Sequence, residues 1–353
     1  LVIASPDQKE PHWDESARNF IEGLILHVVT SREFAGVRNL ITVRTLIRDA
    51  LIAEPRAKLE PDLEGFCKVE YAMLQNAERL KEHDEFDPMA LAIEGAARDF
   101  YDKGDNERSS VLSTVRRHTK FLDYKAMHRV LAGHDFDLPE FKSRAEGVSI
   151  YLCLPAGRLT SCARWLRMFI YQMLDAVERT PSRPASPPAL MILDEFAALG
   201  RMRALEDAVA QVAGFGLKLW VIVQDWGQGL ALYKERWESF TANAGVFQAF
   251  AVNDVTTAEY IARKLGKVPV EIASAAEVEA NKSAAGVSGR QVSVQMFDLL
   301  SPEEINRYFA RSDDLKRQLV IWSGYQPMVL QRVEYFDRSS AVHGAFAGKF
   351  SLR

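Results

Sequence analysis

Five apolar residues in a row, Ala189 to Leu193, lead directly into two adjacent carboxylates, Asp194 and Glu195. A short continuous apolar run is typical of a strand that is buried on both faces of a parallel sheet. Open α/β sheets bind their ligands at the carboxyl ends of such strands. One acid there can hold Mg²⁺ through water, and its neighbour can orient or deprotonate an attacking water. The segment therefore indicates the Walker B half of an ATPase site.

The other half of such a site, a phosphate-binding loop of the form G-x-x-x-x-G-K-[ST], does not occur in the sequence. The next apolar run, Leu217 to Val223, ends at Gln224. Its amide is therefore expected beside Asp194 and Glu195, where it can contact a γ-phosphate or the attacking water. An acidic pair can equally cap a helix, and a strand-end amide can equally cap a turn. On these residues alone, both interpretations stay open.

Composition narrows the class of protein. With 353 residues the chain can hold two domains, and its net charge of −4 gives no overall basic bias toward nucleic acid. Three cysteines without paired spacing argue against a disulfide framework and for a reducing compartment. No apolar run approaches the roughly 18 residues that a membrane helix needs. We therefore expect an α/β protein in which any DNA contact is local.

The pattern changes along the chain. Helical periodicity dominates the first part, with helices expected from Asp14 and over 43–53, 63–81, 88–101 and 109–123. From about residue 147 strands alternate with helices, which predicts βαβ units and a parallel sheet. Strands are expected at 148–153, 189–193, 217–223 and 246–252, a long helix at 160–178, a loop at 274–289, and a hairpin of 317–322 with 328–335. The predicted division is a lead-in over 1–11, an all-helical domain over 12–140, a nucleotide-binding domain over 141–337 and a tail over 338–353.

Four motifs follow one another in a fixed order: L-D-E-F-x-x-L-G from Leu193, A-G-x-G from Ala213, V-Q-x-x-x-Q from Val223, and N-D-x-x-T-A-E-Y from Asn253. This series resembles the type IV coupling proteins, the RecA-like motor ATPases of bacterial conjugation and type IV secretion. The segment 11–18 is similar to the opening of that family's helical domain, and 301–305 to its carboxyl end. The resemblance covers roughly residues 11–336.

The resemblance implies a RecA-like P-loop NTPase sheet, incomplete and parallel here, interrupted by an all-α insert domain. It makes Asp194 the Mg²⁺-associated acid, Glu195 the catalytic carboxylate and Gln224 the sensor amide, with ATP and Mg²⁺ as cofactors. Family members form homo-hexameric rings around a DNA channel, with ATP bound between subunits and an arginine finger from the neighbour. Arg201 and Lys218 are candidates for nucleotide contacts, although each can equally be a surface charge.

The resemblance also implies partners: DNA, relaxase or effector proteins, and inner-membrane components of a type IV secretion system. It places the protein at the cytoplasmic face of the bacterial inner membrane. The chain is expected to start just before the helical insert and to lack the anchor and the phosphate loop, so that this fragment alone is inactive. The nucleic-acid candidates are Arg116, Arg117, His118 and Lys120, unless they form only a solvated helix face.

Several alternatives stay open. Trp226 and Trp237 could stack on bases or pack in a core. Another DNA translocase of the FtsK or HerA type is possible, although the helical insert argues against it. A third interpretation is a nucleotide-free docking module that recruits substrates. The missing phosphate loop favours this interpretation, and the presence of Asp194, Glu195 and Gln224 together argues against it.

Overall fold

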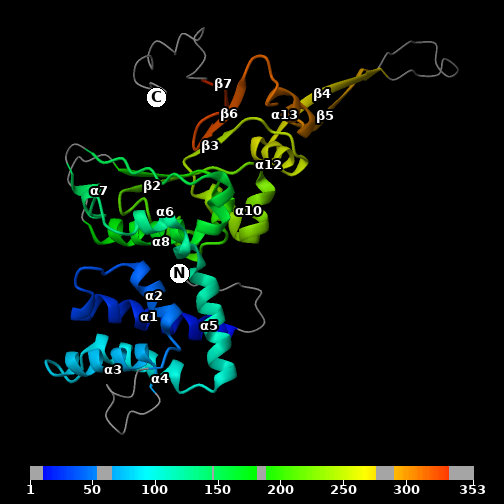
Figure 1. Cartoon of the computed structure of the whole chain (residues 1–353). Helices are drawn as coiled ribbons and strands as arrows, with labels where there is room; N and C mark the ends of the chain where they lie inside the picture. The colour runs from blue at the N-terminus through cyan, green and yellow to red at the C-terminus, as the bar shows by residue number, and fades with distance from the viewer. Residues whose placement is uncertain (1–10, 54–65, 145–146, 181–187, 276–289, 334–353) are drawn as a thin grey trace, which may run out of the picture. The chain divides into compact units, whose positions relative to one another are not determined.

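The computed structural model describes residues 11–53, 66–144, 147–180, 188–275 and 290–333 (Figure 1). The chain divides into two compact units, residues 1–189 with 215–217, and residues 190–214 with 218–353. This division is based on packing and does not test the domain boundary predicted from the sequence at residues 140–141, which stays a prediction. Within the described ranges, no helix has both the length and the apolar character that a bilayer crossing requires.

The first unit is built from helices, as the periodicity predicts. Its α-helices are α1 (Pro11–Thr30), α2 (Leu40–Asp49), α3 (Lys68–Lys81), α4 (Pro88–Tyr101), α5 (Asp105–Thr119), α6 (Lys125–Val130), α7 (Glu140–Ser143) and α8 (Leu159–Arg179). Local sequence sets where they begin. The Asn39 side chain accepts hydrogen bonds from two backbone N–H groups of α2, and Asp87 does the same for α4, where Pro88 occupies the first turn.

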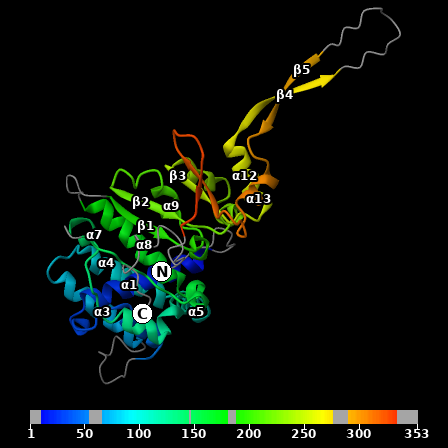
Figure 2. The same ribbon diagram turned by 90° about the horizontal axis from the view of Figure 1, so that it is seen from above.

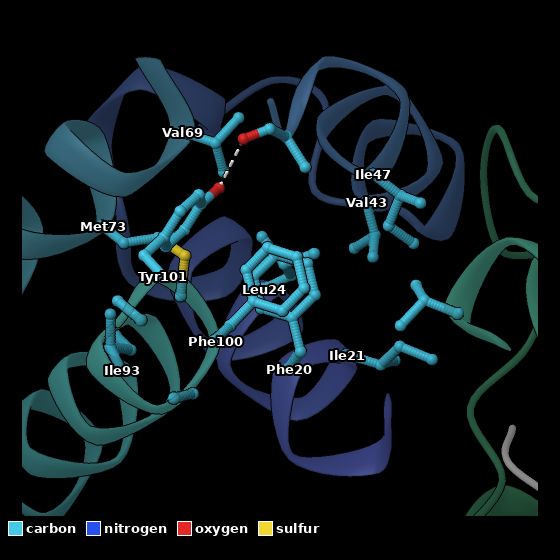
Figure 3. Packing of buried hydrophobic residues seen from close by; sticks show 14 of the residues in the cluster. Phe20, Ile21, Leu24, Val43, Ile47, Val69, Met73, Ile93, Phe100 and Tyr101 are labelled. Atoms are coloured by element: carbon cyan, nitrogen blue, oxygen red, sulfur yellow. Dashed lines mark hydrogen bonds between the residues drawn. The ribbon is translucent and has the colours of Figure 1, made fainter. Parts of the chain in front are cut away.

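The core of the first unit lies where α1 packs against α4 (Figure 3). The rings of Phe20 and Phe100 stack with centroids 3.8 Å apart, and the Tyr101 hydroxyl donates to the carbonyl of Ala50 at 2.8 Å. A Cβ at Gly23 would lie 2.4 Å from the Cβ of Ala96. The glycine therefore lets the backbones of α1 and α4 approach closely enough to bury both rings.

The second unit contains the carboxylate pair. Strands β1 (Ala189–Leu193) and β2 (Leu217–Val221) form a two-stranded sheet. The N–H of Ala189 bonds the carbonyl of Gly216 at 2.9 Å, and the N–H of Ile222 bonds that of Leu193 at 3.0 Å. From the first bond to the second, the residue numbers increase along both strands, so the strands run parallel as predicted. Helices α9 (Arg203–Ala208), α10 (Trp226–Tyr233) and α11 (Trp237–Ala242) accompany them.

A second sheet has the strand order β3-β6-β7, with β3 (Val246–Ala249), β6 (Arg317–Trp322) and β7 (Met328–Gln331). The closing hairpin is present, with a shorter second strand than predicted. The strand expected over 246–252 exists but pairs antiparallel with β6 instead of extending the parallel sheet. This pairing buries Ala249 and Leu319 against residues of α12 (Val255–Leu265) and α13 (Pro302–Tyr308), which explains why the register is kept.

Sequence reasoning missed a long antiparallel ribbon formed by β4 (Lys267–Ala275) and β5 (Arg290–Asp298). Figure 2 shows its two strands extending well beyond α12 and α13 of the same unit. The predicted loop over 274–289 is wrong at its start, because Ser274 and Ala275 continue β4. Residues 276–289 lie outside the described residues.

The strand predicted over 148–153 is also wrong. The described residues there form no strand, and Tyr151 is 83% exposed. A strand requires a neighbour that receives its backbone hydrogen bonds. The apolar run therefore predicted a buried strand, but no described strand pairs with this segment.

Candidate functional site

The carboxylate pair sits in a tight turn at the end of β1. Glu195 adopts the left-handed conformation, with φ 50° and ψ 43°. Such a backbone costs a non-glycine residue about 1–2 kcal/mol, so its neighbours must hold it. The Asp194 carboxylate accepts a hydrogen bond from the N–H of Glu195 at 3.0 Å, and the N–H of Phe196 donates to the carbonyl of Ile222 at 3.2 Å. These bonds aim the Glu195 side chain toward the end of β2.

An aromatic cluster packs around Phe196, the residue that follows Glu195 in the turn. The buried ring of Phe196 stacks on Tyr233 with centroids 5.7 Å apart and on Trp237 at 6.2 Å. A Cβ at Gly229 would lie 1.9 Å from the indole of Trp237, so only glycine fits there. Trp226 and Trp237 are 7% and 3% exposed, which makes them core residues and not base-stacking surfaces. The turn thus rests on a packed support.

The structure brings Glu195 and Gln224 together. The Gln224 side-chain amide donates to both carboxylate oxygens of Glu195, at 3.2 and 3.1 Å. Asp194, Glu195 and Gln224 are all exposed, so a ligand can reach them. The predicted convergence of the two strand ends is therefore present as a direct contact.

Further residues fix the position of the Gln224 backbone and of the loop after it, and none of these contacts was predicted from the sequence. The Gln228 amide oxygen accepts from the N–H of Gln224 at 3.2 Å, and the N–H of Gln228 donates to Asp225 at 2.8 Å. The N–H of Trp226 donates to the Thr257 hydroxyl at 2.8 Å. The V-Q-x-x-x-Q spacing contained the signal, because residues four apart meet at the first turn of a helix. The loop after β2 is thus tied to α10 and α12.

The exposed carboxylates of Asp194 and Glu195 suit a Mg²⁺ ion that is also bound by a phosphate. Mg²⁺ is usually held by one or two carboxylates together with waters and substrate phosphates. Asp194 offers an exposed carboxylate beside Glu195. Within the described ranges, no cluster of three or more His, Cys, Asp or Glu side chains is placed to form a metal cage.

Two basic candidates lie away from the contact between Glu195 and Gln224. Arg201 forms an ion pair with Glu206 at 3.1 Å, and Arg236 contacts the same carboxylate at 3.2 Å. Lys218 is exposed near the start of β2, several strand residues before Gln224. Arg201 is thus engaged by Glu206, and Lys218 lies near the end of β2 opposite to the end that leads to Gln224.

The basic patch of α5 belongs to the first unit. Arg116, Arg117 and Lys120 are exposed, as the prediction requires. His118 is buried instead, and its ring contacts the buried carboxylate of Asp14 at 3.0 Å. Burial lowers the pKa of His118 even though the Asp14 hydrogen bond opposes that change. His118 therefore belongs to the core, and the exposed patch comprises only Arg116, Arg117 and Lys120.

Comparison with known proteins agrees with this architecture. A family model described as type IV secretory system conjugative DNA transfer matches residues 2–350. The chain is 29% identical over 285 residues to the conjugal transfer protein TraG of Escherichia coli, covering 76% of this chain and 41% of the relative. It is 26% identical over 203 residues to VirD4 of Agrobacterium fabrum, covering 57% of this chain and 29% of that protein. The chain thus spans about two fifths of the length of TraG.

Solved structures show the fold. The bacterial conjugative coupling protein TrwBdeltaN70, in its unbound monoclinic form, aligns with a TM-score of 0.60 at 15% identity, covering 94% of this chain and 66% of that one. TrwB in complex with the non-hydrolysable ATP analogue ADPNP aligns with a TM-score of 0.52 at 17% identity, covering 89% and 68%. This likeness confirms the predicted α/β fold class with a RecA-like sheet and an all-α domain. Since the family model spans nearly the whole sequence, the chain belongs to the type IV secretory system conjugative DNA transfer family.

Proposed function

We propose that this chain supplies the carboxylate half of the ATP-hydrolysing site in a type IV coupling protein, a motor that feeds DNA and protein substrates into a secretion or conjugation channel. The carrying observation is the contact between Gln224 and Glu195 at the carboxyl ends of two parallel strands. Family membership and the likeness to TrwB, solved with ADPNP and with ADP and Mg²⁺, support a nucleotide as the ligand.

Each side chain has a distinct task in this proposal. The Asp194 carboxylate binds Mg²⁺ through water, and the Glu195 carboxylate orients and deprotonates the attacking water. Gln224 holds the Glu195 carboxylate through two hydrogen bonds, so a shift of the β2 loop alters the position of the base. Bound ATP with Mg²⁺ supplies the phosphoryl group that is transferred to water. Arg201 and Lys218 stay candidates for phosphate contacts made across a subunit boundary.

The assembly follows from the same proposal. The intact protein is a homo-hexamer at the cytoplasmic face of the bacterial inner membrane, where DNA, a relaxase or effector proteins, and inner-membrane components of the secretion system are its partners. Arg116, Arg117 and Lys120 contact DNA phosphates. The fragment by itself binds Mg-ATP weakly and hydrolyses it negligibly, because its sequence has no G-x-x-x-x-G-K-[ST] loop to cradle the phosphates.

The test uses the full-length protein that carries this chain. Glu195→Gln removes the base and keeps the size of the side chain, so ATP hydrolysis should fall about 100- to 10,000-fold and DNA transfer should stop. Glu238→Gln makes the same chemical change at an exposed residue of α11 and should leave both unchanged. Normal hydrolysis or transfer by the Glu195 variant would refute the proposal.

A further inference from the structure

Among the described residues of its unit, helix α12 contacts β5, and no third strand pairs with the β4–β5 ribbon. Its two nine-residue strands pair only with each other there, and they extend well beyond the helices α12 and α13 (Figures 1 and 2). Val292, Val294 and Met296 on β5 are 53%, 62% and 58% exposed. A two-stranded ribbon is marginally stable alone in water, and exposed apolar strands with free edges invite pairing. The ribbon therefore exposes apolar side chains together with unpaired strand edges.

The hydrogen-bond alternation shows which backbone groups are free. The N–H of Leu299 donates to the carbonyl of Gly266 at 3.0 Å, which makes this a hydrogen-bonded pair of the antiparallel ladder. Counting along the register, Val268 and Phe297 form the next such pair. The intervening residues, among them Val292, Val294 and Met296 on β5, direct their backbone groups to the outer edges of the ribbon.

The two edges differ in how well they are protected. The outer edge of β4 presents Lys267, Pro269 and Glu271. Proline lacks an N–H donor, and charged side chains oppose the approach of another strand. The outer edge of β5 presents Val292, Val294 and Met296, which keep every donor and carry no charge. Of the two ribbon edges, the β5 edge is therefore the one that is open to pairing with an added strand.

We propose that β5 pairs antiparallel with β5 of a second copy of this chain, about a two-fold axis at Val294. Val292 then faces Met296 of the second copy, and Val294 faces its own counterpart. The same register places position 290, an arginine, opposite Asp298 of the second copy. Asp298 contacts Lys267 only at 3.9 Å, so its carboxylate can accept a closer partner.

Self-complementarity is what favours a copy of this chain over an unrelated extended peptide. The edge begins with a cation, ends with an anion and is apolar between them, so reversing the strand produces its own complement. A two-fold contact uses one surface twice, whereas ring closure needs two different surfaces. The contact is thus independent of the proposed nucleotide site, and none of the hydrogen bonds found for Glu195 and Gln224 involves a ribbon residue.

The test is sedimentation velocity of the 353-residue chain from about 1 to about 100 µM. The mass should rise toward twice the 39.7 kDa of one chain. Val294→Pro removes an outward N–H from β5 and should raise the dimer dissociation constant at least about tenfold. Glu271→Pro is the matched control, because Glu271 lies directly opposite Val294 and its N–H faces the β4 edge. It should leave the dissociation constant unchanged.

Charge reversal tests the register. Asp298→Arg should weaken the dimer, and adding Arg290→Asp should restore it, because the pair is only exchanged in direction. Circular dichroism of each variant checks that the chain stays folded. A chain that is monomeric throughout the range, an equal response to the two proline variants, or oligomers that keep growing with concentration would overturn the proposal.

Discussion

The side-chain amide of Gln224 spans both carboxylate oxygens of Glu195, at 3.2 and 3.1 Å, although the two residues are 29 positions apart. The contact is possible because β1 and β2 run parallel and end at the same edge. The left-handed turn at Glu195 and the hydrogen bond from the N–H of Gln224 to Gln228 position the backbone at each of the two residues. The carboxylate and the amide are thus placed to act together in the proposed site.

Gly229→Ala should disturb that unit without touching it. The new Cβ would overlap the indole of Trp237, which packs under Phe196 and so supports the Glu195 turn. Overpacking of this kind costs about 1–3 kcal/mol in the free energy of unfolding. Urea denaturation of the chain measures the loss. Gly245→Ala, where no atom lies within 4 Å of the new Cβ, is the control and should cost far less. Equal effects would show that the cluster is not tightly packed.

The strands that carry the acids and the amide could be predicted because short apolar runs that end in polar residues are typical of sheet strands. The expected burial on both faces is wrong, since Leu190 and Ile192 on β1 are 47% and 54% exposed. The direct contact between Glu195 and Gln224 could not, since it depends on the backbone conformation of one residue. The strand expected over 148–153 failed for a related reason, because periodicity says nothing about the neighbour that a strand requires. The sequence placed His118 on a basic face, but the structure buries it, and the carboxylate that it contacts, Asp14, is 104 positions away.

His27 should make the first unit sensitive to mild acid. Its ring is buried, neither nitrogen has a hydrogen-bond partner among the described residues, and burial lowers its pKa from 6.5 to about 4. The unfolded chain therefore binds a proton below about pH 6.5 that the folded chain binds only below about pH 4. Stability should fall as the pH drops through this window, by at most about 3 kcal/mol.

Urea denaturation of the chain between pH 4 and pH 7 measures this dependence. His27→Leu should flatten the part of the curve that His27 contributes. A parent curve that stays flat across the window, or a His27→Leu curve that keeps the full slope, would contradict the assignment.

The exposed patch on α5 should contribute to DNA affinity through charge alone. Replacing Arg116, Arg117 and Lys120 by Gln in the full-length protein should weaken binding to any DNA sequence. It should also reduce the slope of log affinity against log salt by up to about 3, one for each lost phosphate contact. The control removes equal charge from other exposed positions of the first unit, Arg18, Arg32 and Arg38. Identical slopes for both triple variants would show that the patch has no special role.

Steady-state ATP hydrolysis by the full-length protein, measured as a double-mutant cycle, shows whether Glu195 and Gln224 act together in catalysis. Glu195→Gln and Gln224→Ala are compared singly and together. Because Gln224 acts through the carboxylate that it holds, the double variant should be about as slow as Glu195→Gln alone. Losses that multiply in the double variant, or a Glu195→Gln protein that hydrolyses ATP at the parent rate, would contradict a shared catalytic unit.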